Sequence, residues 1–346
     1  MNAAGRDRQV FHADHSVDGQ SIVAALRIWL NGTSWSAAKK LLAARRISVN
    51  GAMCMDAARR LKAGDVVHVF RHSRTPQPTA DDVQVLYCDE AIAVVVKPAL
   101  MTTQRHREER HWSASRRNLQ PTLEEVLPQV LTGTATPGGE KSRRNRRPRN
   151  RGENSSRSRR SRKHRVYAVH RLDRDTSGVM VFARTPTASH NLIQQFKRHS
   201  NERVYHAIVL GKPDNGTIDT RIVRDRGDGL RGTTSDPEGG QRAVTHLRVL
   251  ETLGDYSLVE CRLETGRTHQ IRVHLSEQGH LVCGDPLYRK RRRQPPFDDH
   301  SGAPRLALHA LRLAFHHPVT NDRLDFQTSL PEDLERFLTR LRDQSN

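Results

Sequence analysis

The sequence predicts an α+β fold in two domains, a small N-terminal α/β domain and a larger second domain. The chain has 346 residues, which is long enough for two domains. Two segments with helical periodicity, at 21–31 and 34–46, precede a strand-turn-strand pattern. Beyond a linker at 72–82, which is rich in Pro, Thr and charge, strand-like runs are interspersed with a few amphipathic helices.

The N-terminal region divides into a tail and a compact domain. We expect residues 1–15 to be a tail and residues 16–71 to form the small domain. Ser34 is placed to cap the second helix, and strands follow at 47–51 and 61–70. Four basic residues lie on this helix and at its end, namely Lys39, Lys40, Arg45 and Arg46. Such a cluster suits an anionic partner, but a solvated helix face also explains it.

The second domain is predicted to cover residues 83–340. Strand-like runs lie at 83–87, 92–98, 203–210, 243–250 and 256–263, and residues 306–326 are also strand-like. One helix begins at Pro186, and another follows Thr268 and ends at Gly279. The segment PEDLERFLTRLRD predicts a capped amphipathic helix near the end of the sequence.

The charge of the chain points to a polyanionic partner. The formal net charge is +20, and no apolar run approaches the ~18 residues of a spanning helix, so nucleic acid is favoured over membrane. Thirteen basic residues against one acid fall within 141–165. We expect an arginine-rich insert at about 132–165 to be disordered in the free protein, because it lacks apolar stretches.

Other patterns exclude several classes of site. The four cysteines, Cys54, Cys88, Cys261 and Cys283, form no CxxC pair, which argues against a zinc ribbon or a disulfide framework and for a reducing cytoplasm. The N-terminus has no apolar core of a secretory signal. The histidines show no metal-ligand spacing, so we expect no metal site.

The most informative segment is His170-Arg-Leu-Asp-Arg-Asp-Thr-Ser-Gly178. It places Asp173 among arginines in a turn that an apolar run, 179–183, anchors. Neighbouring arginines favour the ionised carboxylate, which suits a nucleophile and does not suit a general acid. The alternative is that Asp173 is a salt-bridged turn residue, with Thr176, Ser177 and Gly178 providing turn chemistry.

Six motifs taken in order resemble one family. They are KP at 97–98, HRLDRDTSG at 170–178, RVYHAIVLG at 203–211, LETGRTHQIRVHL at 263–275, GDPLY at 284–288 and LALHALRLAFHHP at 306–318. This order and spacing resembles the RluA-type pseudouridine synthases. Residues 16–71 resemble the small RNA-binding domain shared with ribosomal protein S-four. The resemblance implies a catalytic domain with a mixed, mainly antiparallel sheet.

The resemblance also implies roles for individual residues. Asp173 occupies the position of the catalytic aspartate, Tyr205 that of the tyrosine which stacks on the target uracil, and Arg272 that of the basic partner of the aspartate. Arg171 matches an arginine that enters the RNA stack when the base leaves it, and Arg267 is placed to contact phosphate. Without the resemblance, Tyr205 is expected to be a core residue of a strand and Arg272 a surface residue. Asp175 is expected to be a hydrogen-bonded turn residue.

The chain departs from the family pattern in two places. Members have an Asn before the Lys-Pro pair and a Gly after it, whereas this chain has Val96 and the run 99–101, so the shape of that loop is open. The arginine-rich insert is the second departure. Neither touches the matched catalytic positions.

The implied function is isomerisation of specific uridines in structured RNA to pseudouridine, without a cofactor. No Rossmann fingerprint, P-loop or metal cluster is present in the sequence, in agreement with this. Asp173 either attacks the ribose anomeric carbon or removes a ribose proton to give a glycal, and the sequence leaves both open. A non-catalytic RNA-binding or ribosome-assembly protein is the alternative, and a DNA-binding protein is a third possibility.

The same resemblance sets the expected partners. Recognition of RNA usually targets loops and bulges, so ribosomal RNA, most of all that of the large subunit, is the first expectation and transfer RNA the second. The small domain would contribute Lys39, Lys40, Arg45 and Arg46. We expect a cytoplasmic monomer that does not bind membranes.

Overall fold

The computed structural model describes residues 8–50, 52–71, 78–106, 109, 111–112, 117, 120–133, 165–290 and 295–345. The chain forms two compact units, one of residues 1–77 and 106–121 and the other of residues 78–105 and 122–346. The insert expected at about 132–165 lies outside the described residues, except for 132, 133 and 165.

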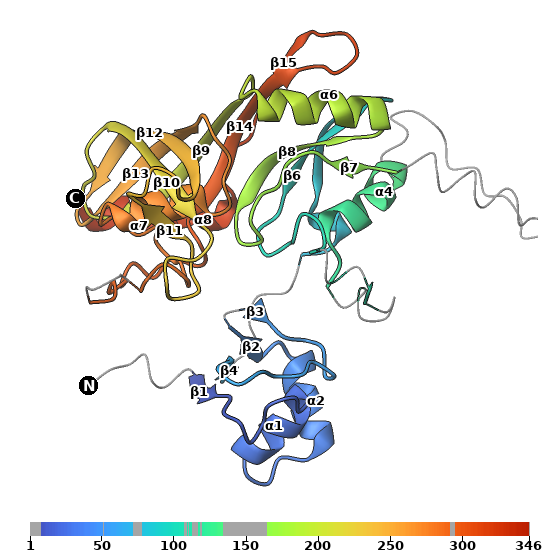
Figure 1. The fold of residues 1–346 in the computed structure, drawn as a ribbon, viewed down its shortest axis with the longest axis vertical. Helices are drawn as coiled ribbons and strands as arrows, with labels where there is room; N and C mark the ends of the chain where they lie inside the picture. Colours follow the sequence, from blue (N-terminus) through green and yellow to red (C-terminus); the bar gives the residue numbers. More distant parts are fainter. Residues whose placement is uncertain are drawn as a thin grey trace, which may run out of the picture. The chain divides into compact units, whose positions relative to one another are not determined.

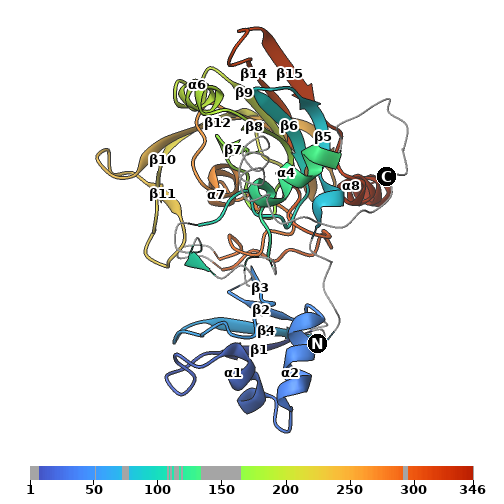
Figure 2. The same cartoon turned by 90° about the vertical axis from the view of Figure 1, so that its right-hand side faces the viewer.

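The first unit packs two helices against one face of a four-stranded sheet (Figure 2). The helices are α1 (Ile22–Trp29) and α2 (Trp35–Ala43), and the Ser21 and Ser34 side chains accept hydrogen bonds from Ala24 and Ala37 as N-caps. The sheet has the order β1 (Arg8–His12), β4 (Val66–Phe70), β2 (Ile47–Val49), β3 (Ala52–Met53). Leu26, Leu42 and Val67 are fully buried between these layers.

Two boundaries differ from the sequence predictions. Residues 8–12 were expected to belong to a tail, but they form β1, which pairs antiparallel with all of β4. This prediction is wrong for those residues because a long-range partner, not local periodicity, makes them a strand. Residues 106–121 were expected in the second domain. They group with the first unit, where the Gln120 side chain donates to the Met53 carbonyl at 3.1 Å.

The second unit is built on an eleven-stranded sheet (Figure 1). Its main order is β11, β10, β12, β13, β9, β14, β8, β6, β5, with β15 added to β14 and β7 added to β8. The strands are β5 (Gln84–Cys88), β6 (Ile92–Lys97), β7 (Tyr167–Ala168), β8 (Ser177–Ala183), β9 (Glu202–Leu210), β10 (Gly216–Val223), β11 (Gly232–Thr234), β12 (Gln241–Leu253), β13 (Tyr256–Leu263), β14 (Leu308–His316) and β15 (Arg323–Gln327). The β8–β14 pair is parallel and the other described pairs are antiparallel. The predicted α+β class with a mixed, mainly antiparallel sheet is confirmed.

Helices cover both faces of this sheet. They are α4 (Leu123–Gly133), α6 (Pro186–Lys197), α7 (Gln270–Glu277) and α8 (Glu332–Ser345), with a short 3₁₀ turn, η2, at Ala80–Asp82. Strand β8 is buried along its whole length. Its Val179 and Val181 pack with α6 residues, while Met180 and Phe182 join the main core on the other face.

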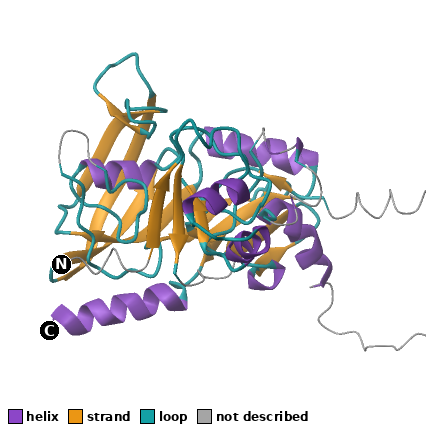
Figure 3. Cartoon of the chain, turned by 90° about the horizontal axis from the view of Figure 1, so that it is seen from below, coloured by secondary structure: helices purple, strands orange, loops and turns teal. Residues whose placement is uncertain are grey.

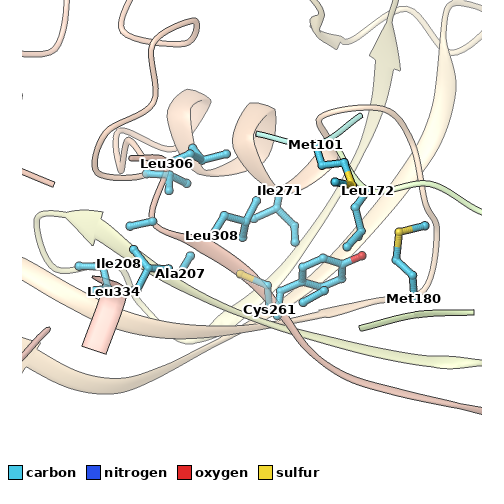
Figure 4. Packing of buried hydrophobic residues seen from close by; sticks show 14 of the residues in the cluster. Met101, Leu172, Met180, Ala207, Ile208, Cys261, Ile271, Leu306, Leu308 and Leu334 are labelled. Carbon is cyan, nitrogen blue, oxygen red and sulfur yellow. The ribbon is translucent and has the colours of Figure 1, made fainter. Parts of the chain in front are cut away.

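The main core anchors the turn before β8. The C-terminal helix α8 lies beside the sheet (Figure 3) and buries Leu334, Phe337, Leu338 and Leu341. Close to the turn, Leu172 packs with Met101 and Met180 (Figure 4). The turn that carries Asp173 is therefore anchored in the main core by Leu172, which is only 4% exposed.

Candidate active site

A cavity of ≈ 450 Å³ opens beside Asp173 in the second unit. Most of its lining comes from the turn before β8, the end of α6, strand β9 and the segment that leads into α7 together with its first turn, and Leu263 and Leu308 complete it. Of the predicted site residues, Arg171, Asp173, Tyr205, Arg267 and Arg272 all lie on its wall. The structure therefore brings together residues that are up to 101 positions apart in the chain, as the span from Arg171 to Arg272 shows.

Asp173 lies between two nitrogen-bearing side chains. Its Oδ2 is 3.8 Å from Arg272 Nη1, and its Oδ1 is 3.8 Å from His269 Nε2. The carboxylate side chain is 16% exposed, so one part of it remains accessible from the cavity. Asp175, two residues along, is 4.0 Å from its neighbour Arg174.

The turn around Asp173 is fixed by a loop that follows β6. The Thr103 hydroxyl donates to the Leu172 carbonyl at 2.8 Å and accepts from the Leu172 N–H at 3.2 Å. Lys97 Nζ donates to the carbonyls of Pro98, Met101 and Arg174 at 2.8 to 3.1 Å. Burial lowers the pKa of Lys97 to about 7. Lys97 and Thr103 therefore hold the backbone of the turn in place through hydrogen bonds to its peptide groups.

This loop is the one whose sequence departs from the family pattern. Leu100 has a backbone φ of +66°, in the left-handed region that a glycine adopts without strain. The loop thus holds the turn despite having leucine where glycine would fit more easily.

Arg272 is bound by the buried carboxylate of Asp285, a residue that the sequence analysis did not select. Its Nε and Nη2 donate to the two oxygens of Asp285 at 2.7 and 2.8 Å, and the side chains are 2% and 0% exposed. Burial alone would lower the pKa of Arg272, but the hydrogen bonds to Asp285 raise it overall. A bidentate pair fixes the guanidinium plane, so Nη1 is left facing Asp173.

His269 is the second residue that was missed. It has a left-handed backbone, φ +60°, at the start of α7, and its Nδ1 is 2.8 Å from the Tyr288 hydroxyl. Burial lowers the pKa of His269, although Asp173 acts in the opposite direction. The same Tyr288 ring lies 5.1 Å from the Arg272 guanidinium carbon. The motifs LETGRTHQIRVHL and GDPLY contain His269 and Tyr288, but no local signal in the sequence shows that the two side chains meet.

Tyr205 is both a core residue and a cavity residue. It lies on β9, is 9% exposed, and belongs to the main hydrophobic cluster. Burial raises the pKa of Tyr205 to about 12, an effect that Arg203 opposes, so its hydroxyl remains protonated at neutral pH.

The remaining predicted residues fall into two groups. Arg171 is exposed on the cavity wall, and Arg267 is half-buried there with its Nε donating to the Arg242 carbonyl at 3.0 Å. In the first unit, Lys39 and Lys40 are exposed on α2, while Arg45 and Arg46 follow it. Arg46 Nε donates to the Phe70 carbonyl at 2.7 Å.

The comparisons identify the family of the second unit. The model of the RNA pseudouridylate synthase family matches residues 91–277. A ribosomal large subunit pseudouridine synthase D from Zymomonas mobilis is 34% identical over 290 residues, which cover 82% of each chain. An uncharacterized RNA pseudouridine synthase from Chloroflexus aurantiacus is 45% identical over 51% of this chain and about half, 54%, of its own length.

A solved structure agrees in fold. Human RNA pseudouridylate synthase domain containing 4 superposes with a TM-score of 0.54 at 24% identity, covering 75% of this chain and 93% of its own. Among the residues that the structure describes, no helix is long and apolar enough to cross a membrane.

Proposed function

This chain belongs to the RNA pseudouridylate synthase family, and from that premise we propose that it isomerises specific uridines of large-subunit ribosomal RNA to pseudouridine. One observation carries the proposal. Asp173 lies on the wall of a cavity that it shares with Tyr205, and Arg272 is fixed beside it by Asp285.

The proposed chemistry rearranges one nucleotide without adding or losing atoms. The bond from the ribose anomeric carbon to uracil N1 breaks, and a bond from the same carbon to C5 forms. The proton on C5 is lost and N1 gains one. Asp173 either attacks the anomeric carbon or removes a ribose proton, and the neighbouring Arg272 cation stabilises the carboxylate in either route.

Tyr205 and Arg171 have complementary roles in this proposal. The reacting bond is inaccessible in a stacked helix, so the nucleotide must be flipped, which costs a few kcal/mol. Arg171 is exposed at the cavity and fills the gap that the base leaves. The Tyr205 ring stacks on the uracil. Its protonated hydroxyl lies near C5 and takes part in the removal of the C5 proton.

The first unit is proposed to bind RNA. Helix α2 presents Lys39 and Lys40 to solvent, and Arg45 and Arg46 follow its end. Such cations contact phosphates and position the RNA, while base contacts choose the uridine. Arg267 adds a phosphate contact at the cavity. We further propose that the protein acts as a monomer in the reducing cytoplasm, in keeping with four cysteines that form no disulfide with one another.

The first prediction tests the proposal directly. Purified protein incubated with unmodified ribosomal RNA should form pseudouridine at defined positions, which chemical sequencing maps. Asp173→Asn should fall below about a hundredth of wild-type turnover, a loss of more than ~2.7 kcal/mol in barrier terms, while RNA affinity stays nearly unchanged.

Asp175→Asn is the matched control, because it removes a carboxylate from the same turn outside the proposed chemistry. It should stay within about tenfold of the wild type. Turnover by Asp173→Asn above the stated limit would remove Asp173 from its role. Modification of transfer RNA alone would reassign the substrate, and RNA binding without any pseudouridine would favour the non-catalytic alternative.

A further inference from the structure

Arg203 is a buried cation without a carboxylate partner among the described residues. It is 9% exposed, and its Nη2 donates to the Glu264 carbonyl at 2.7 Å. Its Nε is buried and has no hydrogen-bond partner among the described residues. Burial of an unpaired charge is unfavourable, and burial lowers the pKa of Arg203 accordingly. A group in this state calls for an anion that the described residues do not supply.

The guanidinium lies at the wall of the cavity. Arg203 and Tyr205 both line it, and because they are two positions apart on β9 they share one face of the sheet, about 7 Å apart along the strand. The guanidinium carbon is 5.9 Å from the centre of the Phe196 ring. A Cβ added at Gly266 would lie 2.3 Å from Arg203 Nη1. The glycine of the TGRT segment therefore leaves room for this guanidinium.

Other cationic side chains line the cavity near Arg203. Lys197 and Arg267 also line the cavity, and Asp173 is the single carboxylate among its described lining residues. Lys197 is exposed. The cavity thus has one negative group, where the chemistry is proposed, and several cations around it. An anionic ligand is favoured at the Arg203 side.

We propose that Arg203 binds the phosphodiester group next to the flipped uridine and holds it while Tyr205 contacts the base. This inference rests on the proposed function, since it takes RNA as the substrate. The phosphodiester supplies the negative charge that Arg203 lacks as a partner and accepts a hydrogen bond from its guanidinium. A purely structural role, in which Arg203 only anchors the Glu264 carbonyl, predicts no dependence on any phosphate.

The test replaces single phosphates. Short RNAs that contain the mapped uridine are made with a neutral methylphosphonate on its 5′ or its 3′ side. Wild-type affinity should fall about tenfold for one of the two positions. Arg203→Gln should bind the unmodified RNA more weakly by a similar factor and should no longer distinguish the methylphosphonate, as a double-mutant cycle requires for a direct contact. Its slope of log affinity against log salt should be shallower by about 0.7.

Two further variants sharpen the test. Arg203→Lys keeps the charge and should retain sensitivity to the methylphosphonate. Lys212→Gln removes an exposed cation that does not line the cavity and should retain the full tenfold effect. Thermal melting of each variant reports whether the fold is kept, and the wild-type series stands even if Arg203→Gln does not fold.

The outcomes separate this inference from the proposed function. A wild type that forms pseudouridine but binds both methylphosphonate RNAs as tightly as the unmodified RNA overturns the role of Arg203 alone. Equal sensitivity of Arg203→Gln and the wild type to the methylphosphonate overturns it as well. A wild type that forms no pseudouridine on ribosomal or transfer RNA overturns the proposed function, whatever Arg203 binds.

Discussion

His170 begins the turn that carries Asp173, and its ring is held as a hydrogen-bond acceptor. Its Nε2 accepts from the Val181 N–H at 3.1 Å, and the ring stacks on Phe196 with 4.4 Å between centroids. A protonated Nε2 would lose this acceptor role. Burial, with a smaller effect of the Arg203 cation, lowers the pKa of His170 to about 3 from its ordinary value of 6.5.

This shift predicts a contribution to acid unfolding. Between pH 6.5 and about pH 3 the unfolded chain binds a proton at His170 that the folded protein does not bind, so stability is lost as pH falls through this range. The loss is at most about 1.4 kcal/mol per pH unit. His170→Gln keeps an acceptor for the Val181 N–H but does not titrate. Its free energy of unfolding should therefore fall less steeply than that of the wild type.

Urea unfolding at a series of pH values from 4 to 8 measures the difference. His300→Gln is the matched control, because its side chain is 79% exposed. Wild-type and His170→Gln curves that remain parallel over this range would contradict the shift.

At the scale of elements, the approach of β14 to β8 depends on Gly178. The parallel pair aligns Ala310 with Gly178, and a Cβ built at Gly178 would lie 2.2 Å from the Ala310 carbonyl oxygen. Gly178 also has a φ of +128°. Beside it, the Ser177 hydroxyl is 2.8 Å from His309 Nδ1. The glycine after the turn that carries Asp173 thus lets β8 and β14 meet.

Gly178→Ala should therefore destabilise the protein by about 3 kcal/mol or more, because it adds a backbone clash to an unfavourable φ. Gly279→Ala is the matched control. Gly279 also has a positive φ, +92°, but nothing lies within 4 Å of its added Cβ, so only about 1 to 2 kcal/mol is expected. Chemical denaturation compares the two. Equal losses in the free energy of unfolding would show that the backbone of Ala310 leaves room for a Cβ at Gly178.

The sequence predicted elements and residues whose signals are local. Strand β8, the Ser34 cap and helix α8 each follow from periodicity or capping chemistry, and Asp173, Tyr205 and Arg272 follow from motif order. Thr103 and Asp285 were missed because their roles depend on partners, Leu172 and Arg272, that only the tertiary fold brings to them. Strand β1 was missed for the same reason, because its pairing with β4 cannot be predicted from the local sequence of residues 8–12.

At the scale of the whole molecule, most of the excess charge is concentrated in one segment. The net charge is +20, and residues 141–165 contain thirteen basic residues and one acid. Polycations bind RNA by displacing counterions from phosphates, which raises affinity and association rate without reading sequence. The second unit holds Asp173, Tyr205 and Arg272, so choice of the uridine is expected to reside there.

Deleting residues 141–164 should therefore weaken RNA binding chiefly at low salt and leave the modified uridine unchanged. This deletion keeps Arg165, whose guanidinium lies 5.0 Å from the Tyr167 ring centre. Each phosphate that the variant no longer neutralises should reduce the slope of log affinity against log salt by about 0.7 for single-stranded RNA.

A variant of equal length, with the basic residues of the segment replaced by Gln, is the matched control that separates charge from chain length. Affinity from low to moderate salt, together with pseudouridine mapping, measures both effects. An unchanged slope, or modification of a different uridine, would show that the segment docks specifically, because counterion displacement alone does not select a base.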